Sequence, residues 1–140
     1  MIEIQPAIAL DAIAISRNLR ERDRAVVERH GPAAEVIRLE IEQSIMALTA
    51  ILDGEIALLW GARTPSPLDD RAYLWMVGTP LIERHPITFL RHSRRAMRYM
   101  ASHFRLLYGE VECDYLASQR WLTWLGARIE PRPEAMVFQL

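Results

Sequence analysis

The chain contains no lysine, and all 17 of its basic residues are arginine. A guanidinium group pairs bidentately with phosphate and stays charged at physiological pH, which gives this choice a functional interpretation. The alternative interpretation is the nucleotide bias of a GC-rich genome, which carries no functional meaning. Because 18 acidic residues balance the arginines, the formal net charge is only -1. Composition therefore provides no general attraction to nucleic acid or to a membrane surface.

The sequence is also poor in cysteine and in long apolar runs. Cys113 is the only cysteine, which excludes an intrachain disulfide and suits a reducing compartment. No apolar run approaches the roughly 20 residues that span a bilayer, and the first residues lack the basic start of a signal peptide. The four histidines are scattered without metal-ligand spacing, so we expect no metal. We expect a protein of the cytoplasm, or of a host cell's cytoplasm, without a membrane partner.

A chain of 140 residues is expected to form one domain over residues 1–140. In the first half, the apolar spacing predicts a strand at residues 2–6 and two helices over 11–30 and 33–44. Asp53-Gly54 lies between two apolar runs and predicts a type I′ hairpin, whose two central residues both need a positive φ. In the second half, the pattern predicts strands at 72–78, 109–116 and 134–140, a helix at 87–107, and a short helix at 117–129 that Gly126 caps.

The predicted order of elements is β-α-α-β-β-β-α-β-α-β. This order predicts the α+β class, an α/β sandwich with a mixed, mainly antiparallel sheet and helices on both faces. Within the predicted strand at 109–116, Cys113 alternates with Glu112 and is expected in the core. No histidine lies near this cysteine in the sequence, so a nucleophilic role is not supported.

Two stretches carry a resemblance to a known family. The element order resembles the GNAT fold of acyl-CoA-dependent N-acyltransferases over nearly the whole chain. "SQRWLTWLGARI" is similar to the late helix of that superfamily: Leu125-Gly126 match, while Ala127 stands where Phe or Tyr is usual. "WMVGTPLIERHPITFLRHSRR" resembles, more narrowly, small tailed-phage proteins with a GNAT-like frame. Some of these are labelled acetyltransferase-like, and others are internal virion or morphogenesis proteins.

The resemblance implies a phosphate-binding loop after the central strand. In GNAT enzymes, backbone N–H groups of this glycine-containing loop hold the pyrophosphate of acetyl-CoA at the N-terminus of the next helix. Here Gly78 stands alone, and Pro80 and Pro86 cannot donate a backbone hydrogen bond, so the loop is degenerate. The implied cofactor is acetyl-CoA, and the implied cofactor-binding residues are Met76, Val77, Gly78, Thr79, His85 and Arg91.

The same resemblance implies that an amine acceptor lies in a gap between two parallel strands, residues 72–78 and 109–116. Acyl transfer needs a base for the amine and an acid for the leaving thiolate. The family's tyrosine acid, four residues before the glycine of Leu-Gly, is replaced by Leu122. The catalytic candidates are Glu112 as base and Tyr115 as acid, with Glu40 and Asp114 as further bases, although exposed carboxylates are the commoner explanation.

The predicted helix at 87–107 carries an arginine stripe from Arg91 to Arg98 without any acid. The stripe has three interpretations: neutralisation of cofactor phosphates, contact with a partner, or the solvated face of an amphipathic helix. Because the chain is nearly neutral and shows no exposed aromatics between the arginines, we expect no nucleic-acid partner.

Two functions follow from the sequence. The first is an acetyl-CoA-dependent N-acetyltransferase acting on an unidentified small-molecule or protein amine. The second is a catalytically inactive GNAT-fold protein with phage virion proteins as partners, acting in virion assembly or as a minor internal virion component. The sequence leaves open whether the chain is an enzyme.

Overall fold

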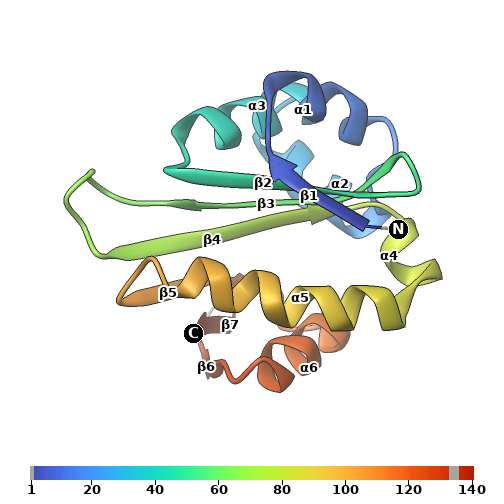
Figure 1. Cartoon of the computed structure of the whole chain (residues 1–140). Coiled ribbons are helices and arrows are strands. Elements are labelled where there is room, and N and C mark those ends of the chain that lie inside the picture. Colours follow the sequence, from blue (N-terminus) through green and yellow to red (C-terminus); the bar gives the residue numbers. More distant parts are fainter. Residues whose placement is uncertain (1, 133–135) are drawn as a thin grey trace. The chain divides into compact units, whose positions relative to one another are not determined.

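The computed structural model describes residues 2–132 and 136–140. Its strands form one mixed sheet with the order β1-β2-β3-β4-β5-β7-β6, and helices complete an α+β fold, which confirms the predicted class (Figure 1). Among the described helices, none is both long enough and apolar enough to cross a bilayer. The elements are β1 (Ile2–Pro6), α1 (Ala9–Ser16), α2 (Glu21–Val27), η1 (Glu28–His30), α3 (Ala33–Gln43), β2 (Met46–Leu52), β3 (Glu55–Arg63), β4 (Arg71–Gly78), α4 (Leu81–Arg84), α5 (Pro86–Ala101), β5 (Leu106–Val111), α6 (Leu116–Trp124), β6 (Arg128–Pro131) and β7 (Met136–Gln139).

The contacts of the chain fall into two units. The first unit comprises Met1–Arg63 and Trp75–Phe89, and the second comprises Thr64–Leu74 and Leu90–Leu140. Strand β4 and helix α5 are each divided between the units, so their first and last residues have different surroundings.

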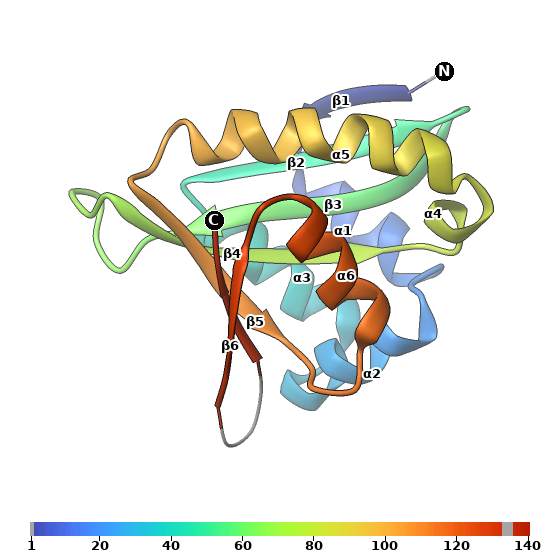
Figure 2. The same ribbon diagram turned by 90° about the horizontal axis from the view of Figure 1, so that it is seen from below.

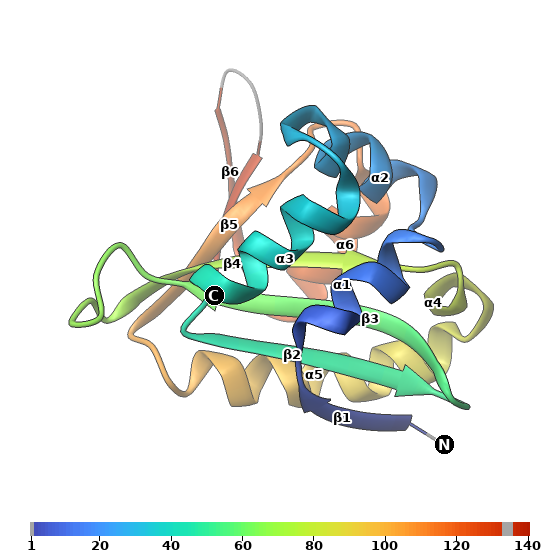
Figure 3. The same cartoon turned by 90° about the horizontal axis from the view of Figure 1, so that it is seen from above.

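The first unit is built on the hairpin of β2 and β3. Asp53 has φ +51° and Gly54 has φ +83°, which confirms the predicted type I′ turn. Strand β1 adds to the hairpin as the antiparallel neighbour of β2, in the register Ile2↔Leu52. Helices α1 and α3 pack together and lie across β2 and β3 (Figure 3). Ile15, Ile37 and other apolar side chains fill the core of this unit.

The predicted helix over 11–30 is wrong in its length. The structure has α1 ending at Ser16, then α2, then the 3-10 turn η1. Arg20 takes a non-helical conformation (φ -55°, ψ 143°), and its backbone N–H donates to the carbonyl of Gly78 at 2.9 Å. A tertiary bond to β4 therefore interrupts a helix that the local pattern would have continued.

The second unit contains a parallel pair followed by an antiparallel hairpin. Residues 71–73 of β4 pair in parallel with residues 106–108 of β5, as expected for the two central strands. Strand β7 pairs antiparallel with both β5 and β6. Figure 2 shows α6 lying between β5 and β6 in the chain path, and Gly126, with φ +98°, ends this helix as predicted.

The predicted helix at 87–107 and strand at 109–116 are wrong at their shared boundary. Helix α5 ends at Ala101 and β5 already begins at Leu106. The N–H of Arg105 donates to the Asp70 carbonyl at 2.7 Å, and this bond starts the pairing with β4. The predicted helix over 117–129 is wrong at its end, because α6 ends at Trp124 and residues 128 and 129 begin β6. Strand β6 was not predicted, since Ile129 is the only aliphatic side chain in its four residues. Residues 134 and 135 of the last predicted strand lie outside the described part of the chain.

Candidate functional site

The end of β4 is bonded to the first turn of α2 and to Arg20, the residue before that helix. The backbone N–H of Gly78 donates to Oδ2 of Asp23 at 2.8 Å, and its carbonyl accepts the N–H of Arg20 at 2.9 Å. Both polar groups of this residue are therefore satisfied within the first unit. The N–H that the sequence suggested for a cofactor phosphate already binds an anionic oxygen.

Asp23 is held in this position by Arg20. The Nε and terminal guanidinium nitrogens of Arg20 lie 2.9 and 2.8 Å from the same carboxylate oxygen. The Asp23 side chain is only 12% exposed, so this charge-assisted bond lies largely out of water. The carboxylate thus occupies the place at Gly78 where an external anion would have to bind.

The hydrogen-bond donors of Thr79 are also used within the protein. Its side chain is buried, its N–H donates to the Ala57 carbonyl at 3.0 Å, and its hydroxyl donates to the Ile56 carbonyl at 3.1 Å. The same hydroxyl lies 3.4 Å from the N–H of Leu81, the first residue of α4. Thr79 therefore ties β4 to β3 and starts α4, and none of these donors faces a ligand.

Side chains pack closely around the glycine at position 78, so that a larger residue there would displace Ile82. A Cβ added there would lie 2.4 Å from Cδ1 of Ile82 and 3.3 Å from Cδ1 of Leu58. Val77 is buried beside it and Met76 is half-buried. The structure thus places residues 76–79 together at the strand end, as predicted, but fills the space around Gly78 with side chains of its own.

The start of α5 offers backbone N–H groups that have no acceptor within the helix. Pro86 begins this helix, so the N–H groups of Ile87 and Thr88 belong to the first turn, where no intrahelical acceptor exists. The first bond of the helix runs from the N–H of Phe89 to the carbonyl of His85, and the His85 side chain is exposed. The first turn of α5 carries no acidic residue. Residues 85–88 therefore combine two orphan N–H groups with an imidazole.

The catalytic candidates Glu112 and Tyr115 lie in a turn after β5 rather than on a strand. The N–H of Tyr115 donates to the Glu112 carbonyl at 3.0 Å, and Tyr115 is the N-cap residue of α6. Nε2 of Gln119 donates to the carbonyls of Glu112 and Cys113, both at 2.9 Å, which fixes the turn. Cys113 is exposed, so the prediction that it packs in the core is wrong. Strand β5 ends at Val111, so the alternation of buried and exposed side chains along a strand does not extend to Cys113.

Glu40 lies in the first unit, on α3. Its carboxylate is half-buried, and Oε2 lies 3.1 Å from Nε of Arg63 on β3. Burial raises the pKa of Glu40, and the Arg63 charge opposes this shift. The side chain thus has a structural partner. Among residues 2–132 and 136–140, no three His, Cys, Asp or Glu side chains cluster as a metal site requires.

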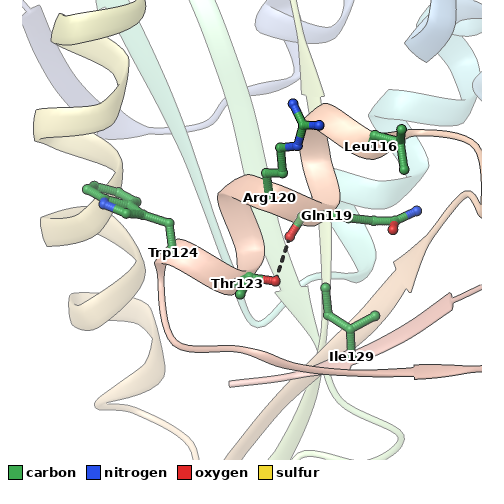
Figure 4. A pocket seen from close by; sticks show the side chains of 6 residues that line it. All are labelled: Leu116, Gln119, Arg120, Thr123, Trp124 and Ile129. Carbon is green, nitrogen blue, oxygen red and sulfur yellow. Dashed lines mark hydrogen bonds between the residues drawn. The ribbon is translucent and has the colours of Figure 1, made fainter.

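An open hollow of about 540 Å³ lies along α6 in the second unit (Figure 4). The ring of Trp124 points toward α5, where the guanidinium of Arg94 lies 3.9 Å from the ring centroid. None of the site residues predicted from the sequence lines this hollow. Its lining consists of Leu116, Gln119, Arg120, Thr123, Trp124 and Ile129.

Solved structures resemble this chain over its full length. The PaiA N-acetyltransferase of Thermoplasma acidophilum in complex with coenzyme A is 14% identical, with a TM-score of 0.70, and the match covers 99% of this chain and 98% of that one. RimL, a ribosomal L7/L12 alpha-N-protein acetyltransferase in complex with coenzyme A, is 12% identical, with a TM-score of 0.69 and coverages of 99% and 93%. The ribosomal-protein-S18-alanine N-acetyltransferase of Escherichia coli is 16% identical, with a TM-score of 0.65 and coverages of 100% and 93%.

These similarities show that the chain has the GNAT acetyltransferase fold, as the sequence predicted. No protein-family model and no curated protein sequence matches the chain. At identities of 10–16%, the neighbours establish the fold and leave the activity to be argued from the site.

Proposed function

We propose that the chain binds acetyl-CoA and transfers the acetyl group to an amine. The observation that carries this proposal is the match, over nearly the full length of both chains, to an N-acetyltransferase in complex with coenzyme A. A fold of this kind hosts the reaction mainly by positioning a thioester beside an amine, and positioning alone supplies much of the rate.

In this proposal the CoA phosphates bind at the start of α5. The N–H of Gly78 does not fit the role, because the Asp23 carboxylate occupies it at 2.8 Å. The first-turn N–H groups of Ile87 and Thr88 do fit, since they lack intrahelical acceptors and the helix dipole favours an anion there. His85 and Arg91, both exposed, supply the side-chain donors.

Acetyl-CoA supplies an activated acyl group with a thiolate as leaving group. The carboxylate of Glu112 is proposed to take the proton of the attacking amine, and the Tyr115 hydroxyl to protonate the departing sulfur. Both residues lie in the turn that Gln119 holds, so their backbones are fixed relative to each other. This assignment takes the place of a late-helix acid, since Leu122 is buried.

The proposed acceptor is a small-molecule or protein amine. Protein amines have the stronger support, because two of the structural neighbours are named as acetyltransferases of ribosomal proteins. An amine attacks the thioester only in its uncharged form. Near neutral pH, a base that takes a proton from the amine is therefore needed.

Isothermal titration with CoA tests the binding step. We expect saturable heat for the wild-type chain and at least tenfold weaker binding for His85→Ala and for Arg91→Ala. Arg120→Ala, which removes an exposed arginine from α6, is the matched control and should bind as the wild type does. No heat at millimolar CoA would overturn the proposal.

Release of the free CoA thiol with a panel of peptide and small amines tests the transfer step. Glu112→Gln and Tyr115→Phe should lower kcat at least tenfold while leaving CoA binding unchanged. Equal turnover in these variants would remove both residues from the chemistry without affecting the binding proposal.

A second candidate is a GNAT-fold protein without catalysis, acting in phage virion assembly or inside the particle. The internal use of the Gly78 and Thr79 donors favours the absence of cofactor binding, while the phage role rests on the sequence resemblance alone. Mass spectrometry of purified particles and assembly intermediates tests it. Absence of the chain from both would contradict this function, and its presence without CoA binding would support it.

A further inference from the structure

The exposed face of α5 carries three arginines in a row. Arg91, Arg95 and Arg98 are exposed, and within the described part of the chain none of them forms an ion pair. We call these three residues the α5 arginine row. Helix α5 contains no acidic residue at all, although the whole chain has a formal charge of -1. Positive charge is therefore concentrated on one helix face.

The spacing of the α5 arginine row aligns its members. Residues three, four and seven apart lie on the same face of a helix, and the axial rise of about 1.5 Å per residue spreads the row over roughly 10 Å. The opposite side of α5 is occupied by Ser93, Met97 and Met100, which are buried. Three like charges side by side are mutually unfavourable, and a row of partner anions would offset that cost.

An aromatic pair lies beside this row. Tyr99 is 54% exposed, and its ring meets that of His103 edge-on with centroids 4.7 Å apart. Nδ1 of His103 lies 2.8 Å from the Tyr99 carbonyl, which can only accept, so this nitrogen carries the proton and the hydrogen bond holds the imidazole beside the Tyr99 ring. Two features of the sequence argued against a nucleic-acid partner: the near-neutral charge of the chain and the absence of exposed aromatics between the arginines. The exposed ring of Tyr99, directly after Arg98, answers the second, and the absence of acidic residues from α5 answers the first for this helix face.

We propose that this face of α5 binds single-stranded nucleic acid. Exposed guanidinium groups in a row contact successive phosphates, and an exposed aromatic ring stacks on a base. An acidic peptide could also pair with the arginines, but it has no base to stack on the Tyr99 ring. The combination of charges and aromatic ring therefore favours nucleic acid. Arg94 does not take part, because its guanidinium lies on the Trp124 ring and donates to the Trp124 carbonyl.

Fluorescence anisotropy with a labelled 20-nucleotide single strand, in DNA and RNA versions, tests the proposal across a salt series. Three phosphate contacts predict that log Kobs falls against log salt with a slope of about -2. The variant Arg95→Gln/Arg98→Gln should bind at least tenfold more weakly, with the slope reduced to about -0.7. Arg17→Gln/Arg128→Gln removes two exposed arginines from other segments and is the matched control for net charge. It should bind as the wild type does.

Substitutions at Tyr99 test base stacking separately from charge, because they leave the charge of the chain unchanged. Tyr99→Ala should weaken binding about tenfold without changing the salt slope, whereas Tyr99→Phe should retain the affinity. Absence of binding at 50 mM salt would overturn the proposal. So would equal losses in the two arginine variants, or an unchanged affinity in Tyr99→Ala together with full competition by heparin, which would indicate a general polyanion surface.

Nucleic-acid binding by this face does not depend on whether the chain binds acetyl-CoA. Arg91 is shared with the proposed cofactor site, so the decisive variant leaves it in place. Arg95→Gln/Arg98→Gln should bind CoA with the heat of the wild-type chain while losing nucleic acid. Failure to bind CoA and failure to bind nucleic acid are therefore separate outcomes.

Discussion

The sequence allowed anion binding in two regions, Gly78–Thr79 at the end of β4 and the α5 arginine row. In the first, a carboxylate and two carbonyls of the protein take up every donor. In the second, three guanidinium groups are exposed, and no acidic side chain among residues 2–132 and 136–140 pairs with them. Buried donors must be satisfied when the chain folds, whereas exposed arginines are satisfied by water until a ligand arrives. The comparison shows that a strand-loop-helix pattern does not by itself indicate where an anion binds.

Asp23→Ala should have the largest effect on stability. The change leaves the largely buried Arg20 guanidinium and the Gly78 N–H without their acceptor, and we expect a loss of about 3 kcal/mol in the free energy of unfolding. Urea denaturation measures it. The control Asp70→Ala removes an exposed carboxylate that pairs with Arg105, and it should cost less than about 1 kcal/mol. Equal losses in the two variants would contradict the description of the β4 end.

Gly78→Ala should cost about 2 kcal/mol, because the new methyl group overlaps Cδ1 of Ile82. Ile82→Val removes that atom. In the double variant, urea denaturation should therefore give a smaller loss than the sum of the two single losses. Strict additivity would mean that Ile82 is not what excludes a side chain at this position.

Thr79→Val should cost about 1 kcal/mol, since the hydroxyl that donates to the Ile56 carbonyl is replaced by a methyl group of the same shape. Thermal unfolding followed by circular dichroism measures the change. Thr79→Ser keeps the hydroxyl and serves as the control. If instead Thr79→Val left stability unchanged but abolished CoA binding, this hydroxyl would be a ligand donor rather than a structural one.

Arg95→Gln/Arg98→Gln should change the free energy of unfolding by less than about 0.5 kcal/mol, with a slight gain because two like charges three residues apart are removed. The same urea denaturation detects it. A loss above about 1 kcal/mol would show that these arginines hold the fold and would end the contrast with Asp23.

Local chemistry determined what the sequence predicted correctly. The hairpin at Asp53-Gly54 depends on the φ preferences of two adjacent residues, and the end of α6 depends on a positive φ at Gly126. These features need no information from distant segments. The strand at residues 72–78 was also recognised, since its continuous apolar run is typical of a central strand.

Long-range bonds determined what the sequence could not predict. Arg20 breaks the first helix by bonding to Gly78, and Arg105 starts β5 by bonding to Asp70. For the candidate site, the residues of the β4 end were identified, but nothing in the local pattern connects Gly78 with Asp23, 55 positions earlier. Tyr99 was missed for a related reason, because its exposure depends on which helix face packs.

Two-dimensional ¹H–¹⁵N NMR of the labelled chain, titrated with CoA, tests whether Asp23 keeps Gly78 from the cofactor. We expect the amide resonances of Ile87 and Thr88 to shift progressively with CoA while the Gly78 amide stays in place. A Gly78 amide that moves most, with unchanged amides at the start of α5, would contradict it.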